Sequence, residues 1–371
     1  MSRLPASTDL FVVGGGPVGL AAAIAARARG FEVTVAEHSA PPIDKACGEG
    51  IMPDGAAAAR ALGIRLEDAG AQPFRGIRFR EGDVAVEAEF PAGVGFGVRR
   101  TALHQLMARR AADCGVHLAW GARVTGIGLG GVETGEGLVR ARWIVGADGG
   151  DSAVRRWAGL DACARESRRY GFRRHYRVAP WTDFMELHWS DGCQLYITPV
   201  GTSEVCVAVL SGDPRLRLED ALPRFPEAMR RLRGAEPSSL ERGAVTASRR
   251  LRQVCSGNVA LVGDASGSVD AISGEGMCLL FQHSTALAAA MEAGDLRTYG
   301  AAHRRAGRRP RMMASLMLSL GRQRALRGHV LRALASRPRL FRGMLAMHVG
   351  ELSVLDFAAN GLALGWRMLT I

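Results

Sequence analysis

The sequence predicts an α/β fold that carries an inserted antiparallel β-sheet and ends in a helical segment. Three observations lead to this prediction. Near the N-terminus, a short apolar strand runs into glycines and is followed by an Ala-rich helix. Two later stretches repeat the order of strand, aspartate, turn and helix. Finally, residues 301–371 alternate Arg with Leu, Met and Ala at helical spacing.

Composition narrows the class of protein. A chain of 371 residues with 47% hydrophobic content can form one large domain or two closely joined domains. Its seven cysteines include no CxxC pair and its nine histidines no HxxxH pair, so neither a disulfide framework nor a metal site is expected. The first apolar run is broken by Gly14–Gly16 and Pro17, which suit a turn. We therefore expect a cytoplasmic protein without an integral membrane segment.

The net charge of +12 is concentrated near the C-terminus. Residues 301–371 hold thirteen arginines against Glu351 and Asp356. Few aromatic residues accompany these arginines, so a nucleic-acid partner is not expected. The spacing favours amphipathic packing helices with a solvated basic face. Attraction of an anionic substrate and peripheral contact with a membrane surface remain open.

The N-terminal unit gives the clearest secondary-structure signal in the chain. DLFVVGGG is a strand, PVGLAAAIAARARG a helix and FEVTVAEH a second strand, with glycines 14, 16 and 19 at the turn. In this Rossmann-like context Gly14 allows a tight turn, Gly16 lets the backbone approach a pyrophosphate, and Gly19 lets helix and strand pack closely. Glu37 ends the second strand, where it can accept hydrogen bonds from a ribose. The unit predicts a bound dinucleotide, either NAD or FAD.

Two further stretches favour FAD. Residues 143–160 contain a strand, the turn that begins at Asp148 and a helix. Residues 258–291 contain a strand, Asp264, a loop and a helix that opens at Gly274, Gly276 and Met277. An aspartate at a strand end can accept hydrogen bonds from ribityl hydroxyls, and free N–H groups at a helix start can face a phosphate or the edge of a flavin. NAD needs no such second set of anchors.

Together these motifs resemble the superfamily of FAD-dependent monooxygenases and geranylgeranyl reductases, related to para-hydroxybenzoate hydroxylase. The resemblance covers roughly residues 8–300. It implies that FAD is held by a set of glycines, acids and one arginine: Gly14, Gly16, Gly19 and Glu37 on the ADP half, Asp148 in the GADG turn, Asp264 on the ribityl chain and Arg100 at a helix start.

The stretch DKACGEGIMPDG is similar to the KxCGxG loop of the geranylgeranyl-reductase branch, which lies beside the isoalloxazine ring. This makes Cys47 and Lys45 candidate catalytic residues and Gly48 a candidate cofactor-binding residue. Lys45 is the only lysine of the chain, and a solvent-facing lysine is an equal interpretation. Cys47 also suits a small buried hydrophobic side chain.

Two strand-rich insertions, residues 74–90 and 175–210, alternate polar and apolar residues and contain hairpin signals at Glu81–Asp83 and Ser190–Gly192. They predict one antiparallel sheet that roofs the flavin. Six of its large side chains are candidates for a pocket, although each singly is more typical of core or surface: Tyr176, Trp181, Met185, His188, Trp189 and Tyr196. The predicted division is 1–73, 98–165 and 246–305 for the FAD-binding domain, 74–97 and 166–245 for the sheet domain, and 306–371 for C-terminal helices.

The favoured function is an FAD-dependent oxidoreductase, a monooxygenase that uses NAD(P)H and acts on an aromatic or conjugated small molecule in specialised metabolism. One alternative is reduction of carbon–carbon double bonds by a geranylgeranyl-reductase-like flavoenzyme, which the CGEG loop supports. A third possible function is that of a flavin-free binding protein. It is disfavoured because all the expected FAD-binding motifs are present. The segment Ala265–Gly267 lacks the histidine of ordinary phenol hydroxylases, which weakens assignment to that group.

Overall fold

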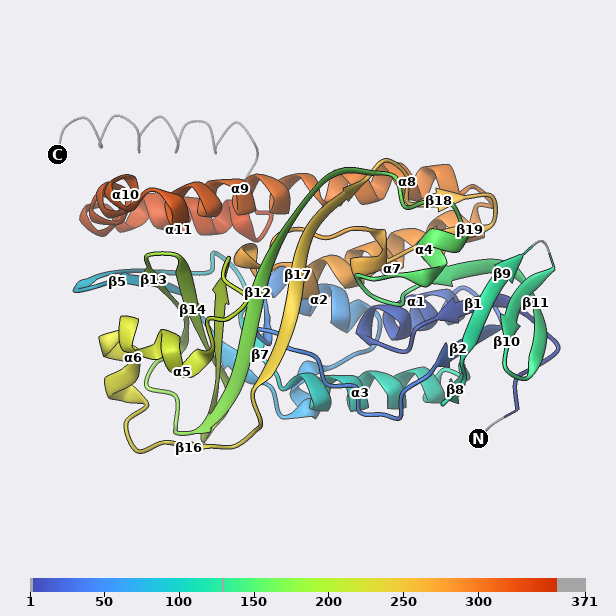
Figure 1. Ribbon diagram of the computed structural model, residues 1–371, viewed down its shortest axis with the longest axis horizontal. Helices are drawn as coiled ribbons and strands as arrows, with labels where there is room; N and C mark the ends of the chain where they lie inside the picture. The colour runs from blue at the N-terminus through green and yellow to red at the C-terminus, as the bar shows by residue number, and fades with distance from the viewer. Residues whose placement is uncertain (1–2, 129, 352–371) are drawn as a thin grey trace.

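The structure is a computed structural model that describes residues 3–128 and 130–351. Two large β-sheets lie towards opposite ends of the long axis of the molecule, and the C-terminal helices run along one side of the sheet at the left (Figure 1). Residues 352–371, part of the predicted C-terminal helical segment, lie outside the described residues. Within the described part, no helix has both the length and the apolar content needed to cross a bilayer.

The first sheet has a parallel core in the spatial order β19, β11, β1, β2 and β8. Its strands are β1 (Ser7–Val13), β2 (Val33–Glu37), β8 (His117–Trp120), β9 (Val124–Gly128), β10 (Gly131–Thr134), β11 (Gly137–Gly146), β18 (Cys255–Ser256) and β19 (Val259–Leu261). All of β2 is buried, as expected for a parallel strand covered on both faces. Because β1, β11 and β19 are parallel neighbours, their carboxyl ends meet at one edge of the sheet.

Helices pack on this sheet or on one another beside it. They are α1 (Pro17–Arg27), α2 (Pro53–Ala61), α3 (Arg100–Asp113), α4 (Ala153–Trp157), α7 (Gly276–Glu292) and α8 (Leu296–Ala306), with the 3-10 turns η1 (Leu66–Ala69), η3 (Gly263–Ser266) and η4 (Ala271–Ser273). Helix α1 packs between the sheet and helices α3 and α7. Gly55 of α2 permits a close approach to α7, since a Cβ atom there would lie 2.6 Å from Cys278 Sγ.

The second sheet has the order β16, β12, β15, β14, β13, β5 and β6, with β17 also paired to β12. Its strands are β5 (Gly76–Glu81), β6 (Val84–Glu89), β12 (Cys163–Arg177), β13 (Phe184–Ser190), β14 (Cys193–Gly201), β15 (Glu204–Ser211), β16 (Glu236–Pro237) and β17 (Arg242–Leu251). The two predicted hairpins are confirmed as β5–β6 and β13–β14. A small third sheet of β3 (Gly50–Ile51), β4 (Gln72–Phe74) and β7 (Gly95–Gly97) lies beside it.

The predicted antiparallel insertion needs one correction. Strands β5 and β13 pair in parallel, because the chain leaves the second sheet after β6, builds much of the first sheet, and returns through β12. Strands β12 and β17 also cross the predicted boundaries at 165/166 and 245/246. They run as a long pair from the second sheet towards the first (Figure 1). The domain division remains a prediction.

The second sheet is covered on both faces. Helices α5 (Leu218–Ala221) and α6 (Pro226–Arg231), joined by η2 (Leu222–Arg224), cover one face. The other face contacts helices α9 (Arg308–Arg322), α10 (Arg324–Ser336) and α11 (Pro338–His348). This enclosure explains why all but the last residue of β14 are buried.

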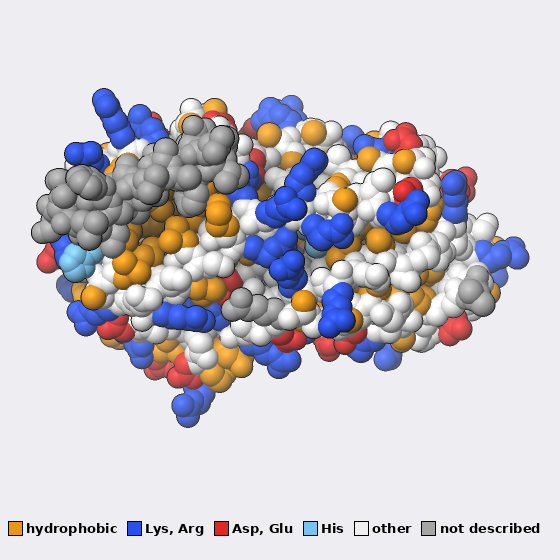
Figure 2. All heavy atoms as spheres, turned by 90° about the horizontal axis from the view of Figure 1, so that it is seen from above, with side chains coloured by type: hydrophobic (Ala, Val, Ile, Leu, Met, Phe, Trp, Pro, Cys, Tyr) orange, Lys and Arg blue, Asp and Glu red, His pale blue; other side chains and the backbone are white. Residues whose placement is uncertain are grey.

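The predicted amphipathic character of the C-terminal helices is confirmed for the described part. On α9 the buried positions follow a helical stripe: Pro310, Met313, Ala314, Met317 and Leu320. Figure 2 shows arginine side chains spread over the upper face of the molecule, close to hydrophobic side chains of this region. Arg327 is an exception to the predicted solvated basic face: it is 1% exposed, and acids from two hairpin turns compensate its charge.

Arg327 fastens α10 to the second sheet. Its guanidinium pairs with Glu81 at the β5–β6 turn, lies 3.1 Å from Asp191 Oδ1 at the β13–β14 turn, and donates to the carbonyl of Leu320 at 3.2 Å. One buried cation therefore joins two hairpin ends and the end of α9.

We predict that Arg327→Met lowers the free energy of unfolding by about 2–3 kcal/mol, because buried charge-assisted hydrogen bonds are lost while the chain length is kept. Urea denaturation followed by circular dichroism measures this change. Arg324→Met is the matched control. Arg324 is exposed and lies 3.3 Å from Asp191 Oδ2, so its replacement should lower the free energy of unfolding by less than about 1 kcal/mol. Equal losses in both variants would contradict the anchoring role.

Candidate active site

The glycine turn after β1 has the geometry that a dinucleotide needs. Gly14 has φ +110°, and a Cβ atom there would lie 2.4 Å from the carbonyl oxygen of Ala147. A Cβ atom on Gly19 would lie 1.9 Å from the carbonyl oxygen of Gly14. Gly16, by contrast, faces open space, and no side chain caps the start of α1. The turn is thus closed by two glycines, while the third leaves room for a pyrophosphate at a helix N-terminus.

Glu37 lies at the end of β2 as predicted, and its side chain faces the glycine turn. Its carboxylate is 8% exposed and accepts hydrogen bonds from the N–H groups of Gly15 at 2.9 Å and Ser39 at 2.8 Å. The side chain therefore fixes the glycine-rich loop. Its bond to a ribose remains a prediction.

Asp148 follows β11 and caps the helix after it. Its carboxylate accepts from Ser152 Oγ at 2.5 Å and from the N–H groups of Ala153 at 2.7 Å and Val154 at 3.1 Å. These bonds hold the GADG turn and the start of α4. Direct contact between Asp148 and a cofactor also remains a prediction.

Asp264 lies in η3, directly after β19. Its side chain is half exposed, and Oδ2 lies 2.9 Å from Lys45 Nζ. The structure thus joins two predicted site residues that are 219 positions apart. The carboxylate stays accessible to the hydroxyl groups of a bound molecule.

The start of α7 provides a second surface with open backbone. Gly276 has no atom near its added Cβ position, and the side chain of Glu275 does not cap the helix. Gly274, just before it, has φ +70°. Arg100, the first residue of α3, reaches this surface, with Nη1 3.5 Å from Met277 Sδ. Together with the glycine turn and Asp264, this arrangement fits FAD.

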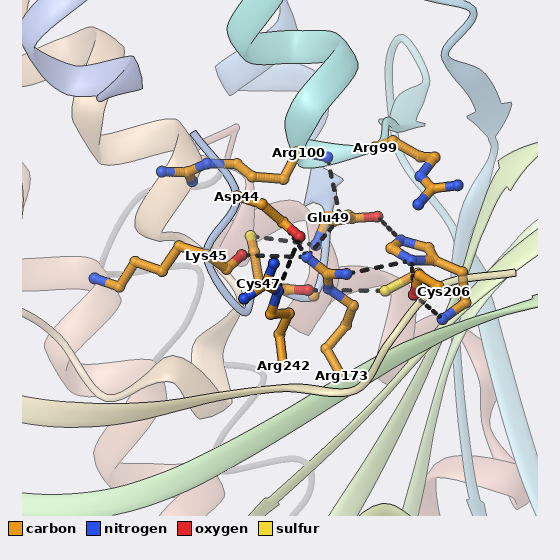
Figure 3. A network of polar contacts seen from close by, with 12 residues as sticks. Asp44, Lys45, Cys47, Glu49, Arg99, Arg100, Arg173, Cys206 and Arg242 are labelled. Atoms are coloured by element: carbon orange, nitrogen blue, oxygen red, sulfur yellow. Dashed lines mark hydrogen bonds and ion pairs between the residues drawn. The ribbon is translucent and has the colours of Figure 1, made fainter. Parts of the chain in front are cut away.

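The CGEG loop is held by a buried carboxylate, that of Glu49 (Figure 3). Glu49 Oε1 accepts from the N–H of Arg100 at 3.0 Å, and Oε2 lies 2.7 Å from His175 Nε2. On its other side the His175 ring contacts Ser239 Oγ at 2.8 Å. Glu49 has φ +60°, which is rare for a residue with a side chain. The buried partners explain how this conformation is maintained.

Arg173, two residues before His175 on β12, joins the same network. Its guanidinium is buried, pairs with Asp44, and lies 3.7 Å from Glu49 Oε1. Ligand atoms of Glu49, His175 and Cys206 lie within 4.8 Å of one another, a spacing that a metal could use. The adjacent cation disfavours a second cation there, and burial raises the pKa of the Cys206 thiol well above its usual range. We interpret the network as support for the loop.

Cys47 lies inside this supported loop and is partly exposed. Its sulfur accepts from the N–H of Glu49 at 3.3 Å, and its carbonyl oxygen lies 3.7 Å from Cys206 Sγ. The carbonyl of the next residue, Gly48, accepts from Thr198 Oγ1 at 2.8 Å. A Cβ atom on Gly48 would meet no other atom within 4 Å. The loop is thus fixed to the second sheet and keeps open space at Gly48.

An apolar cavity lies next to both the CGEG loop and the start of α7. Its wall includes Met52, which follows the loop, and Ile272 and Ser273, which precede α7. The second sheet adds Met185 and Tyr196, two of the predicted pocket residues, and helices α9 and α11 close the other side. Three other predicted pocket residues lie on the opposite face of the second sheet, with α5 and α6: Tyr176, Trp181 and His188. Trp189 packs in the core against Phe79.

Sequence reasoning missed the supporting residues of the loop. Glu49 carried a usable signal, since a charged residue between two glycines is unusual. His175 and Arg173 carried a weaker one: they are two positions apart on a strand and therefore share a face.

We predict that Asp264→Ala weakens FAD binding about tenfold to a hundredfold, because a charge-assisted hydrogen bond worth about 1.5–3 kcal/mol is lost. Fluorescence titration of the apoprotein with FAD measures the dissociation constant. Asp151→Ala removes a carboxylate that is 98% exposed and serves as the control with unchanged affinity. Undiminished affinity in Asp264→Ala would place the ribityl contact elsewhere.

The fold is shared with solved flavoenzymes. Over 94% of this chain and 100% of the other, it superposes on the p-nitrophenol 4-monooxygenase of Pseudomonas putida with a TM-score of 0.78 and 16% identical residues. At this identity the similarity concerns the fold alone.

Two sequence relatives are reductases by name. The chain is 30% identical over 304 residues to a menaquinone reductase of Mycobacterium tuberculosis, covering 73% of each protein. It is 28% identical over 312 residues to digeranylgeranylglycerophospholipid reductase 1 of Methanopyrus kandleri, covering 78% of this chain and 80% of the relative. Residues 7–298 match the family described as FAD binding domain. The chain therefore belongs to this family and is an FAD-dependent oxidoreductase.

Proposed function

We propose that this flavoenzyme reduces carbon–carbon double bonds in an isoprenoid chain, with NAD(P)H as the source of electrons. The apolar cavity beside the CGEG loop and the start of α7 is the observation that carries the proposal. The sequence motifs alone favoured a monooxygenase, with double-bond reduction as the alternative.

The cavity encloses only about 40 Å³, so a hydrocarbon chain would enter by displacing the side chains of its wall. Five methionines line it: Met52, Met185, Met313, Met317 and Met344. Methionine side chains are unbranched and adapt to irregular apolar ligands. Most of the remaining wall is Leu, Ile and Phe, so an isoprenoid chain would be taken up by burial of apolar surface.

The position of the cavity supports a redox role. FAD, when bound, supplies the hydride chemistry of the reaction. The protein positions the reacting parts: Glu49 and His175 hold the CGEG loop on one side, and the uncapped start of α7 lies on the other. The apolar wall excludes water from the space between them.

The sequence relatives agree with this substrate class. Their names describe reductases of menaquinone and of digeranylgeranylglycerophospholipids, and they align with three quarters of this chain or nearly so. The stretch DKACGEG, which resembles the geranylgeranyl-reductase loop, lies beside the cavity wall formed by Met52.

Monooxygenation of a conjugated small molecule is the second candidate. Phe79 and Tyr196 present aromatic rings to the cavity, which would suit a flat substrate. The fold also serves the p-nitrophenol monooxygenase named above.

One experiment separates the two candidates. The FAD-loaded protein is reduced without oxygen by NADH, NADPH or dithionite, and geranylgeraniol is added. We expect a product heavier by two hydrogen atoms, formed anaerobically and detected by mass spectrometry. A product that requires oxygen and gains one oxygen atom would instead establish the monooxygenase, and no product from this or other prenyl chains would overturn the proposal.

The loop residue Cys47 gives a further prediction. Cys47→Ala should retain FAD, because the loop is held by Glu49 and Thr198, yet lower the turnover of the reduction at least tenfold. Cys47→Trp should obstruct the space beside the loop and alter the bound-flavin spectrum. Absorbance spectra and steady-state rates of both variants test this. If both behave like the parent protein, the loop lies away from the ring.

A further inference from the structure

The apolar cavity has a polar end formed by His348, the last residue of α11. This side chain is 6% exposed and contributes to the cavity wall. Its Nδ1 atom is fully buried and makes no hydrogen bond. A buried imidazole nitrogen without a partner is costly in an apolar surrounding, unless a ligand or water satisfies it.

A second unsatisfied atom lies beside it. Glu275, just before α7, is 3% exposed, and its Oε2 has no hydrogen-bond partner. This oxygen lies 3.9 Å from His348 Nδ1, which is too long for a direct hydrogen bond. Two orphaned polar atoms thus lie close together, one in the cavity wall at His348 and the other directly behind it at Glu275.

The cation nearest to Glu275, Arg309, is shared with Asp54 and lies closer to Asp54. Arg309 of α9 lies 3.2 Å from Asp54 Oδ2 of α2, but 3.9 Å from Glu275 Oε1. Gln282 of α7 also donates to Asp54. Burial raises the pKa of Glu275 to about 8 despite Arg309, and burial lowers the pKa of His348 to about 4. Near pH 7 a neutral carboxylic acid therefore faces a neutral imidazole.

The other polar side chains of the cavity wall are already engaged. The hydroxyl of Tyr196 donates to the carbonyl of Ile272 at 2.8 Å, and Ser273 Oγ donates to the carbonyl of Asp270 at 3.2 Å. Among the described wall residues, His348 is thus the polar contact left for a ligand.

We propose that His348 and Glu275 form a polar subsite that binds a neutral hydroxyl or carbonyl oxygen at one end of an otherwise apolar substrate. The inference rests on the proposed function only in taking this cavity as the place where the isoprenoid substrate binds. A phosphate group is disfavoured, because neither the neutral Glu275 nor the neutral His348 compensates its negative charge and Arg309 is already paired with Asp54.

Binding measurements on the FAD-loaded protein test the subsite without turnover. Isothermal titration calorimetry compares geranylgeraniol with the hydrocarbon of the same skeleton that lacks the hydroxyl group. We expect the alcohol to bind about tenfold more tightly. His348→Leu should reduce this ratio to near one, while Met344→Leu, on the same wall of the cavity, should keep it.

A second variant and a third ligand complete the test. His348→Phe keeps a ring of similar size and should also abolish the preference, which covers the case that the leucine variant does not fold. An unchanged preference in a folded His348 variant overturns the proposal, as does tighter binding of geranylgeranyl diphosphate than of the alcohol. Failure of the reductase assay leaves these binding ratios measurable, so the two proposals fail separately.

The protonated state of Glu275 is tested through stability. A carboxyl group with a pKa near 8 in the folded protein and 4.5 in the unfolded chain stays protonated only when folded between these values. The contribution of Glu275 to the free energy of unfolding should therefore fall as pH rises from about 4.5 to about 8, whereas that of His348, whose pKa is lowered, rises between about 4 and about 6.5. The titratable and charged groups that face Glu275 from the elements packed around it are Asp54, Cys278, Arg309 and His348. Urea denaturation across this range should show that the stability of Glu275→Gln relative to the parent protein increases as pH rises, and a difference that does not change with pH would refute a protonated Glu275.

Discussion

The buried carboxylate of Glu49 is the interaction on which the arrangement of the active site depends. It joins the CGEG loop to the first turn of α3 through the N–H of Arg100 and to the second sheet through His175. These contacts come from segments separated by 51 and 126 residues. Without a carboxylate at this position, two buried donors and the Arg173 guanidinium would lose a shared acceptor. The cost of leaving such groups unpaired forces loop, helix and sheet into one relative placement.

The parts of the site that depend on local geometry were predictable from the sequence. Gly14 and Gly19 are required by steric contacts within one turn, and Asp148 and Asp264 follow buried strands whose carboxyl ends meet. The network of Glu49 and His175 was not predictable, because it pairs residues that only the tertiary fold brings together. Arg327 misled sequence reasoning for a similar reason. An arginine on an amphipathic helix normally faces water. Here the two acids of the hairpin turns compensate the charge of the buried guanidinium.

The reaction proposed for this fold depends on what the second sheet and the C-terminal helices enclose. The FAD-binding part of the molecule resembles that of both monooxygenases and reductases, so it does not distinguish them. The proposal of a reductase rests on the character of the enclosed wall, which is mainly aliphatic and rich in methionine, with a polar group at His348. A phenol would call for more polar contacts than this wall offers.

Two of the walls of the cavity come from different parts of the sequence. Its sheet wall is interleaved with the strands that build the nucleotide-binding part, whereas its helical wall is one continuous stretch, α9 to α11, that follows all of the flavin motifs. Insertions, deletions or exchanges within that stretch can lengthen or shorten the enclosed space while leaving the glycine turn, Asp264 and the CGEG loop in place. Under the proposed function, changes in α9 to α11 would alter the accepted substrate length without altering the residues expected to hold the flavin.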